Sequence, residues 1–225
     1  HRTPYKQVIF NNSKWIYAVD PADYANTKAT WDKTATNRTF ARVVAVSGFK
    51  SYTLAGGTDA IPSDGNLESA YDLFANKETT DISLVLTGNA STAVQQYVIN
   101  NLAESRGDCV AFVSPPENAV VNQSGSENDK ITTWLSNLAR QSSFVVADSG
   151  WKYQYDKYNN VYRWIPLNGD IAGLCVRTDQ TNDPWFSPAG TNRGVIKNVV
   201  KLAWNPTQGQ RDSIYSVGVN PVVSL

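Results

Sequence analysis

The residues of this chain that could take part in catalysis are not spaced in any recognised catalytic motif. His1 is the only histidine, so neither a Ser-His-Asp nor a Cys-His arrangement is expected. The best single candidate is Asp148, because it follows a predicted strand and ligands often bind at the carboxyl ends of strands. Asp108, Asp170 and Asp179 could act as its partners. Aspartates are common at turns and helix caps, so we expect structural roles for all four and no enzyme activity.

Motifs for cofactors and ligands are equally sparse. Residues 87–91 (Thr-Gly-Asn-Ala-Ser) join a predicted strand to a predicted helix, where phosphate can bind, but they lack the glycine fingerprint of a nucleotide site. Zinc-ligand spacing is absent. Cys109 and Cys175 lie in apolar stretches and are expected to be buried, reduced thiols. The Arg106-Gly-Asp108 triplet has the sequence of an integrin ligand, but it precedes a predicted buried strand, which favours coincidence. We expect no cofactor and no metal.

Composition narrows the class of protein further. The chain has 225 residues and 24.7 kDa, enough for one large domain or two small ones. Its 20 Lys and Arg residues balance 20 Asp and Glu residues, which argues against nucleic-acid binding, because that needs a concentrated basic face. A net charge near zero also weakens the repulsion between copies and suits a subunit that assembles. The chain has no apolar run long enough to span a membrane, so no membrane insertion is expected.

Strands and helices alternate from about residue 53, and they must position any site. Apolar periodicity predicts helices over 67–74, 94–102, 126–138 and 168–178, and a further helix after residue 207. It predicts strands over 81–86, 109–113, 143–147, 199–204 and 219–223. Ser126 is the predicted N-cap of its helix, and Asn159-Asn160 the turn of a hairpin over 153–164. This order predicts an α/β fold with a largely parallel or mixed sheet flanked by helices.

The amino-terminal region differs in composition from the rest. Residues 1–52 are rich in Thr, Asn and β-branched residues, and strands are predicted over 7–10, 15–19 and 39–46. The glycines Gly56 and Gly57 mark a boundary. We therefore expect a small β-rich region over 1–52 and an α/β domain over 53–225.

Aromatic residues are concentrated between residues 148 and 195, where three of the seven tryptophans and four of the eleven tyrosines fall. The predicted helices and strands already supply apolar stripes for a core, so this set is in excess of what a core needs. We hypothesise that part of it is exposed and forms a subunit interface. The alternatives are packing on the chain's own hairpin or a carbohydrate-binding platform. The candidate residues are Tyr153, Tyr155, Tyr158, Tyr162, Trp185 and Phe186.

The same stretch resembles one protein family. Residues 151–158 (Trp-Lys-Tyr-Gln-Tyr-Asp-Lys-Tyr), 166–179 and 184–190 are similar to successive segments of tail sheath proteins of contractile-tailed bacteriophages, and residues 54–59 and 106–116 also resemble sheath segments. The resemblance covers roughly residue 53 to the carboxyl end, and the agreement of several ordered blocks makes it specific. The residues that match the motif are Gly56, Gly57, Trp151, Pro166, Gly169, Gly173, Arg177, Pro184, Trp185 and Pro188.

Within residues 166–179 the family pattern is Pro-x-x-Gly-x-x-Ala-Gly-x-x-Ala-Arg-Thr-Asp, and the chain departs from it at Val176, where Ala is usual. The resemblance implies a structural subunit that polymerises helically around an inner tail tube. Contraction would then drive the tube through the host envelope for genome ejection. The implied partners are other sheath subunits, the tail tube and baseplate proteins. The implied location is the virion tail, after assembly in the host cytoplasm.

The resemblance also implies that residues 1–52 are the end of a domain inserted into the sheath core. The chain contains no Met and begins at His1, so we expect a piece of a longer protein. Two alternatives remain open from the sequence. One is a carbohydrate-binding or hydrolytic α/β protein that uses Asp148 and the aromatics. The other is the sheath subunit of a contractile injection system outside phages.

Overall fold

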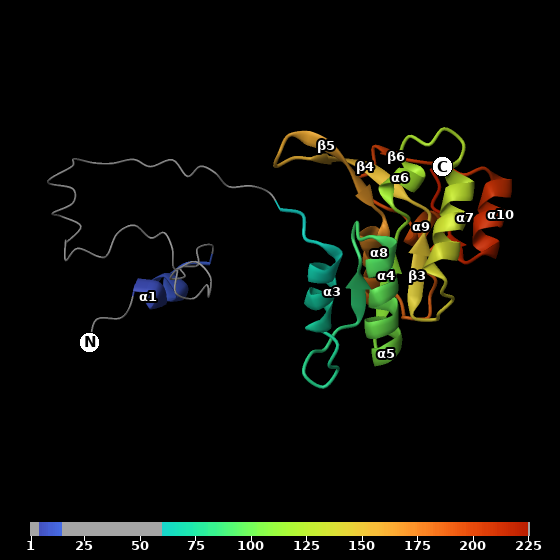
Figure 1. Ribbon diagram of the computed structural model, residues 1–225. Coiled ribbons are helices and arrows are strands. Elements are labelled where there is room, and N and C mark those ends of the chain that lie inside the picture. Colours follow the sequence, from blue (N-terminus) through green and yellow to red (C-terminus); the bar gives the residue numbers. More distant parts are fainter. Residues whose placement is uncertain (1–4, 15–59, 225) are drawn as a thin grey trace. The chain divides into compact units, whose positions relative to one another are not determined.

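The computed structural model describes residues 5–14 and 60–224 (Figure 1). The chain divides into two compact units, His1–Asp59 and Ala60–Leu225, which are considered separately. In the first unit, helix α1 (Tyr5–Asn12) is described. The strand predicted over residues 7–10 is therefore wrong, because a short apolar run such as Val-Ile-Phe fits a helix as well as a strand.

Several expectations for the amino-terminal region fall where the structure gives no description. These are the strands predicted over 15–19 and 39–46, the domain boundary near residue 53, and the motif residues Gly56 and Gly57. They stay predictions.

The second unit is organised around a four-stranded parallel sheet with the order β1-β2-β3-β7. Its strands are β1 (Leu84–Leu86), β2 (Val110–Val113), β3 (Val145–Asp148) and β7 (Val219–Asn220). All three pairings are parallel, as expected for strands that are separated along the chain by helices. The predicted α/β fold is thereby confirmed.

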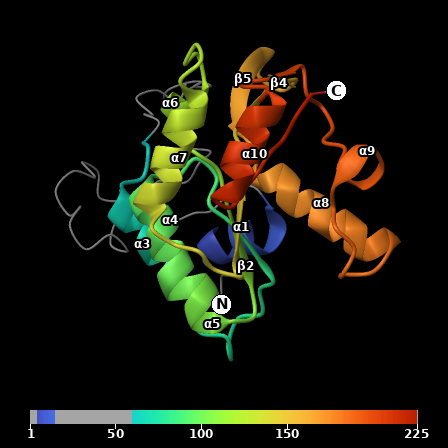
Figure 2. The ribbon, with the colours of Figure 1, turned by 90° about the vertical axis from the view of Figure 1, so that its right-hand side faces the viewer.

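Helices cover both faces of this sheet (Figures 1 and 2). On one face a rod of three consecutive segments, α4 (Thr92–Val98), η2 (Ile99–Ala103) and α5 (Glu104–Arg106), lies with α7 (Glu127–Leu138) and α10 (Gln208–Ser216). Val85, Ala111 and Ala147 from the strands share one apolar core with Val98 and Ile131 from these helices. Helix α8 (Asn168–Thr181) packs on β1, β2 and β3 from the other face.

The apolar periodicity of helix α7 predicts a buried stripe of Ile131, Trp134, Leu135 and Leu138. Ile131, Trp134 and Leu138 are buried, whereas Leu135 is only partly buried against the core. The N-cap position falls on Ser126 as predicted, but its side chain does not cap the helix. Its Oγ donates to the carbonyl oxygen of Gln123 at 2.9 Å. The Glu127 carboxylate instead accepts a hydrogen bond from the backbone N–H of Gly125 at 2.7 Å.

The helix predicted over 94–102 is present but contains a π-helical turn at η2. The buried side chains of this rod include Val94, Val98 and Leu102, followed by Arg106 at its end. The periodicity that predicts this helix places Tyr97 on the same side as Val94 and Val98. Tyr97 is only half-buried, and its hydroxyl donates to Asp72 Oδ1 at 2.6 Å. A π-helical turn contains one residue more than a turn of α-helix. Residues four positions apart, such as Val98 and Leu102, therefore stay on the same side of the rod.

A second, antiparallel sheet stands beside the first, with the order β5-β4-β6. The predicted hairpin is confirmed as β4 (Trp151–Asp156) and β5 (Val161–Pro166), and β6 (Lys201–Leu202) pairs with β4. The loop over 157–160 is closed by the Asp156 carboxylate, which accepts hydrogen bonds from the backbone N–H groups of Tyr158 and Asn159. Asn160 takes the left-handed conformation that the turn needs, with φ of 53°.

Several predicted elements differ in length or in their buried side. The strands predicted over 81–86, 199–204 and 219–223 are reduced to β1, β6 and β7, which leave the ladder early because they lie at sheet edges. Helix α8 begins at Asn168 as predicted, but it buries Ala172, Leu174 and Thr178, whereas Ile171 and Cys175 are half-buried.

The two cysteines are free, and Cys109 is buried while Cys175 is only partly so. The helix predicted after residue 207 is present as α10, in which Ile214 is buried and Tyr215 is 69% exposed.

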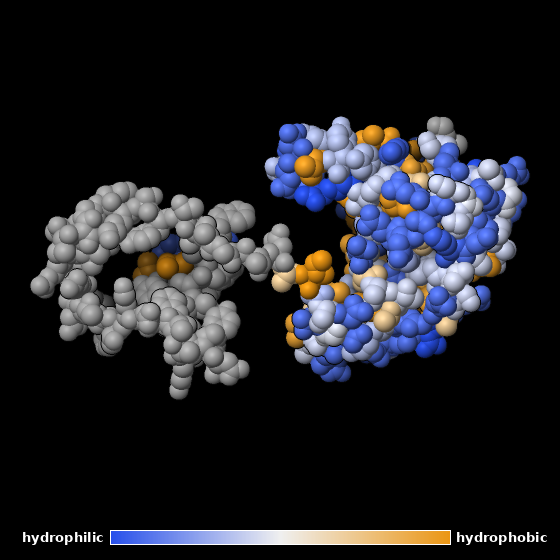
Figure 3. All heavy atoms as spheres, turned by 45° about the horizontal axis from the view of Figure 1, so that its top comes forward, coloured by the Kyte–Doolittle hydropathy of each residue, from blue (hydrophilic) through white to orange (hydrophobic). Residues whose placement is uncertain are grey.

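Helix α3 (Asp64–Asp72) confirms the helix predicted over 67–74, although none of its residues is fully buried. Leu67 and Tyr71 pack against the core from its edge, whereas Ala70 and Phe74 are exposed. The short helices α6 (Glu117–Val120) and α9 (Gly190–Arg193) complete the unit. Apolar side chains form separate patches on the face shown in Figure 3, rather than one continuous surface.

Candidate functional site

Asp148, the leading catalytic candidate, ends β3 at the carboxyl edge of the parallel sheet but is sealed from solvent, with 1% of its surface exposed. Ser114 Oγ donates to Asp148 Oδ2 at 2.6 Å, and the backbone N–H of Gly150 donates to Oδ1 at 2.9 Å. Ser114 Oγ accepts two hydrogen bonds in turn, from the backbone N–H and Nδ2 of Asn168, both at 3.0 Å. The first turn of α8 therefore fills the place where α/β enzymes bind ligands.

Burial raises the pKa of the Asp148 carboxyl to about 7, against the hydrogen bonds from Ser114 and Gly150, which lower it. The other candidate aspartates do not complete a catalytic group. Asp170 raises the pKa of Asp148 slightly, but its carboxylate pairs with Lys152 Nζ at 2.8 Å. Asp108 pairs with an arginine, and Asp179 is exposed on α8. No substrate could reach Asp148 without displacing α8.

The hydrogen bonds around Asp148 belong to a wider buried network that sequence reasoning missed. Gln95 Nε2 donates to the carbonyl oxygen of Ser114 at 2.8 Å, and Trp134 Nε1 donates to Gln95 Oε1 at 3.0 Å. Asn168 Nδ2 also donates to the carbonyl oxygen of Gly88 at 2.8 Å, which ties the loop over 87–91 to α8. The network joins four elements, and each of these polar groups has a partner, as buried polar groups require.

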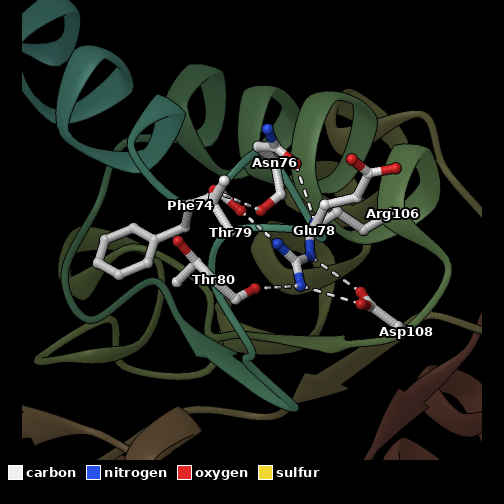
Figure 4. A network of polar contacts seen from close by, with 7 residues as sticks. All are labelled: Phe74, Asn76, Glu78, Thr79, Thr80, Arg106 and Asp108. Carbon is white, nitrogen blue, oxygen red and sulfur yellow. Dashed lines mark hydrogen bonds and ion pairs between the residues drawn. The ribbon is translucent and has the colours of Figure 1, made fainter.

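The Arg106-Gly-Asp108 triplet is an internal clamp (Figure 4). The Arg106 side chain is 1% exposed. Its guanidinium donates to both Asp108 carboxylate oxygens, at 2.8 and 2.9 Å, and to the carbonyl oxygens of Phe74 at 2.6 Å and Thr80 at 2.9 Å. Hydrogen bonding to Arg106 lowers the pKa of Asp108. The triplet therefore holds the loop over 74–80 against α5, and an adhesion receptor could not reach the arginine.

The aromatic candidates divide into two groups, and the first lies on the hairpin. Tyr153 stacks on Tyr162 with ring centres 5.4 Å apart, and Tyr155 contacts Tyr162 at 5.0 Å. Lys201 Nζ lies 5.2 Å from the Tyr153 ring. Tyr155 and Tyr162 are 43% and 52% exposed, and Tyr158, in the hairpin loop, is 87% exposed. Tyr153 is half-buried.

The second group lies in the segment that leads into α9. Trp185 stacks on Phe186 with ring centres 6.4 Å apart, and the two side chains are 78% and 40% exposed. The Arg193 guanidinium lies 5.3 Å from the Phe186 ring, and its Nε donates to the carbonyl oxygen of Ser187 at 3.1 Å. Among the described residues no ring contact joins this group to the hairpin.

The motif residues fall into a buried set and an exposed set. Trp151 is 3% exposed, faces Pro166 across the hairpin, and donates from Nε1 to the carbonyl oxygen of Pro115 at 2.7 Å. Gly169, Gly173 and Arg177 are exposed on α8. Pro184 is exposed and Pro188 half-buried in the segment that carries Trp185. An open cleft of about 240 Å³ lies between α8 and α9, lined by Arg177, Thr178, Thr181, Asn182, Asn192 and Arg193.

Within residues 5–14 and 60–224, no group of three or more His, Cys, Asp or Glu side chains is placed to hold a metal ion. None of the helices described there has both the length and the apolar character that a membrane span requires.

Comparisons with known proteins point to one family. Residues 68–224 match the family model for the phage tail sheath protein central domain. The chain is 40% identical over 195 residues to the tail sheath protein of Vibrio phage KVP40, covering 78% of this chain and 29% of that protein. It is 40% identical over 188 residues to the tail sheath protein of Enterobacteria phage T4, covering 76% of this chain and 28% of that protein.

The tail sheath protein of Salmonella phage ViI is 31% identical over 223 residues, covering 98% of this chain and 31% of that protein. This chain thus spans only 28–31% of the length of these relatives. A chain in a cryo-EM structure of the anti-feeding prophage baseplate shares the fold, with a TM-score of 0.50 at 17% identity over 75% of this chain and 40% of that one. From the match over residues 68–224, this chain belongs to the phage tail sheath family.

Proposed function

We propose that this chain is part of a structural subunit of a contractile phage tail sheath. The subunit polymerises helically around the tail tube and contracts to drive the tube through the host envelope for genome ejection. The observation that carries the proposal is the family match over residues 68–224, together with 40% identity to the tail sheath proteins of two phages. The partners would be further sheath subunits, the tail tube and the baseplate. The place of action would be the virion tail, after assembly in the host cytoplasm.

The surroundings of the reactive side chains support a structural role without catalysis. Asp148, the strongest catalytic candidate, is buried and hydrogen-bonded to Ser114 and to Gly150. A contractile sheath needs no site for a substrate, since identical subunits exchange one set of contacts for another without unfolding. A parallel sheet with helices on both faces provides a rigid body for such a rearrangement.

We further propose that the hairpin aromatics become buried between subunits. Tyr155, Tyr158 and Tyr162 are 43%, 87% and 52% exposed, although aromatic side chains of this size are usually covered. Polar groups surround them, among them Lys157, whose Nζ lies 5.0 Å from the Tyr158 ring. Aromatic anchors within a polar rim are typical of protein interfaces.

Negative-stain electron microscopy of the longer protein expected to carry this chain tests the proposed function. Sleeves or stacked rings are the expected result. Dispersed monomers that bind a glycan would overturn the proposal in favour of a carbohydrate-binding protein. The relatives with 31–40% identity are tail sheath proteins of phages, which favours a phage tail over a contractile injection system outside phages.

A further inference from the structure

Two arginines lie on the side of the second unit formed by α8 and α9. Arg177 and Arg193 line the same cleft, and neither forms an ion pair with an acidic side chain in the described part of the chain. Arg193 is held in place by the Phe186 ring and by the bond from its Nε to Ser187. The terminal nitrogens of both guanidinium groups therefore remain available to a carboxylate, which arginine binds with two parallel hydrogen bonds.

The exposed side of α8 leads into this cleft and carries no bulky side chain in its first turns. Gly169, Gly173 and Arg177 are spaced four residues apart, so they lie on one side of the helix. A Cβ added at either glycine would meet no other atom within 4 Å. The chain's own packing thus does not require glycine here, although glycine weakens a helix relative to alanine. A bare backbone of this kind lets a second helix approach closely.

Helix α3 presents the opposite charge. Asp64, Glu68 and Asp72 are also four residues apart and form an acidic row. Like charges at this spacing repel each other, and no basic side chain in the described part of the chain pairs with them. Ser91 and Tyr97 donate hydrogen bonds to Asp64 and Asp72, which fixes the position of two of the three carboxylates. Neutral donors orient this row but do not neutralise it.

The charge imbalance extends beyond these residues. Residues 64–81 contain five acidic side chains and one lysine, whereas residues 168–211, which include α8 and α9, contain five basic side chains and three acidic ones. Figure 2 shows α3 and α9 on opposite sides of the unit. The Arg106 clamp holds the loop over 74–80, so the acidic segment is presented as a fixed surface. Two different, complementary surfaces on opposite sides of one chain produce a head-to-tail contact that repeats from copy to copy.

We propose that the acidic row on α3 of one copy docks against the exposed side of α8 of the next copy, with its carboxylates bound by Arg177 and Arg193. The glycines at 169 and 173 then admit the incoming helix. This inference rests on the proposed sheath function, which requires copies to associate, and it names the surfaces that meet. It is separate from the hairpin aromatics.

Reversing the charges on each surface of the 225-residue chain tests the pairing. The first variant carries Arg177→Glu and Arg193→Glu, and the second carries Glu68→Lys and Asp72→Lys. Each variant then has two surfaces of the same sign. By sedimentation velocity at low salt, each variant alone should self-associate at least about tenfold more weakly than the original chain, because like charges face each other. An equimolar mixture should recover the original association, since each surface of one variant now complements a surface of the other.

A matched control carries Lys130→Glu and Arg140→Glu, which changes the net charge by the same amount as the first variant but lies on and after α7. It should associate as the original chain does. A mixture that associates no better than its components, or a control that weakens association equally, overturns the pairing. Circular dichroism checks that every variant is folded. Sleeves seen by electron microscopy together with a failed mixture would reject this contact alone, whereas the absence of any polymer would reject the proposed function.

Discussion

Two tryptophans from the same stretch of sequence lie in opposite surroundings. Trp151 is 3% exposed and donates its indole N–H to the carbonyl oxygen of Pro115. Trp185 is 78% exposed, and the ring that it contacts is its sequence neighbour Phe186. The same contrast holds for charge, since Asp148 is buried with two hydrogen-bond donors, whereas Arg177 is exposed and has no acidic partner among the described residues.

The difference indicates that aromatic and charged residues serve internal packing in one region and contact with other molecules in the other. Around Asp148 and Trp151, polar groups are matched with one another, which fixes how the sheet, α7 and α8 fit together. Around Trp185 and Arg177, aromatic rings are exposed and the arginines have no acidic partner among the described residues, which resembles the composition of a protein interface. Changes in the first region should alter stability, and changes in the second should alter assembly.

The largest expected change in stability lies in the buried region, where polar groups are paired with one another. Trp134→Ala should lower the free energy of unfolding by about 3–5 kcal/mol, because it empties a core position and leaves Gln95 without its indole donor. Urea unfolding followed by circular dichroism measures the change. A loss below about 1 kcal/mol would mean that the side chain is not part of the core.

Asp148 should make stability depend on pH. The folded protein keeps the carboxyl protonated up to about pH 7, against 3.8 as its ordinary pKa. Between these values the folded state binds more protons than the unfolded state, so stability should fall as pH rises, by about 1.4 kcal/mol per pH unit from this group. Above about pH 7 its contribution no longer changes.

The measurement compares Asp148→Asn with the original chain in urea at pH 5 and at pH 8, which cancels the titration of other groups. The difference in unfolding free energy between the two proteins should shift in favour of the original chain at pH 5. A difference that is the same at both pH values would show that the carboxyl titrates normally in the folded protein.

On the exposed side of α8, Gly173→Ala should change stability by a smaller amount and should increase it. An alanine Cβ meets no atom within 4 Å and improves helix propensity, so the chain should gain about 0.5–1 kcal/mol. Sleeve formation by the longer protein should weaken at the same time. Assembly that is unchanged or improved would indicate that no second backbone approaches this side of α8.

The smallest effect on stability is expected at the hairpin loop. Tyr158→Ala removes a side chain that is 87% exposed, so the unfolding free energy should stay within about 0.5 kcal/mol. Assembly of the longer protein should nevertheless weaken. Tyr215→Ala, at a tyrosine on α10 that is 69% exposed, is the matched control and should leave assembly unchanged. Equal losses at both positions would remove the distinction between the hairpin and the rest of the surface.

Apolar periodicity correctly predicted those helices that bury a single row of apolar side chains. In α7, Ile131, Trp134 and Leu138 repeat at helical spacing and are buried as predicted, whereas Leu135 is only partly buried. The strand predicted over 7–10 was wrong, since a short apolar run carries too little periodic signal to separate a strand from a helix. The strands at the sheet edges were predicted too long, because pairing ends where a neighbouring strand ends.

The candidate site was only partly predictable. Asp148 was identified by its place after a strand, but burial by α8 depends on contacts between residues more than fifty positions apart, such as Ser114 and Asn168. No local pattern marks Gln95 or Asn168 as buried, because each is paired with residues distant in the sequence. The exposed aromatics were expected as one set, and only the three-dimensional structure separates Trp185 and Phe186 from the hairpin.

The π-helical turn over 99–103 has a consequence for insertions and deletions in this chain. Each residue of an α-helix advances the next by about 100°, so a one-residue deletion ahead of the turn, within 94–98, would rotate Val94 away from the side that carries Arg106. The turn itself already absorbs one surplus residue. Deleting the exposed Asn101 should therefore restore a regular α-helix and leave Arg106 facing the Phe74 and Thr80 carbonyls. We therefore expect this rod to accept a change of length at the π-helical turn and not within 94–98.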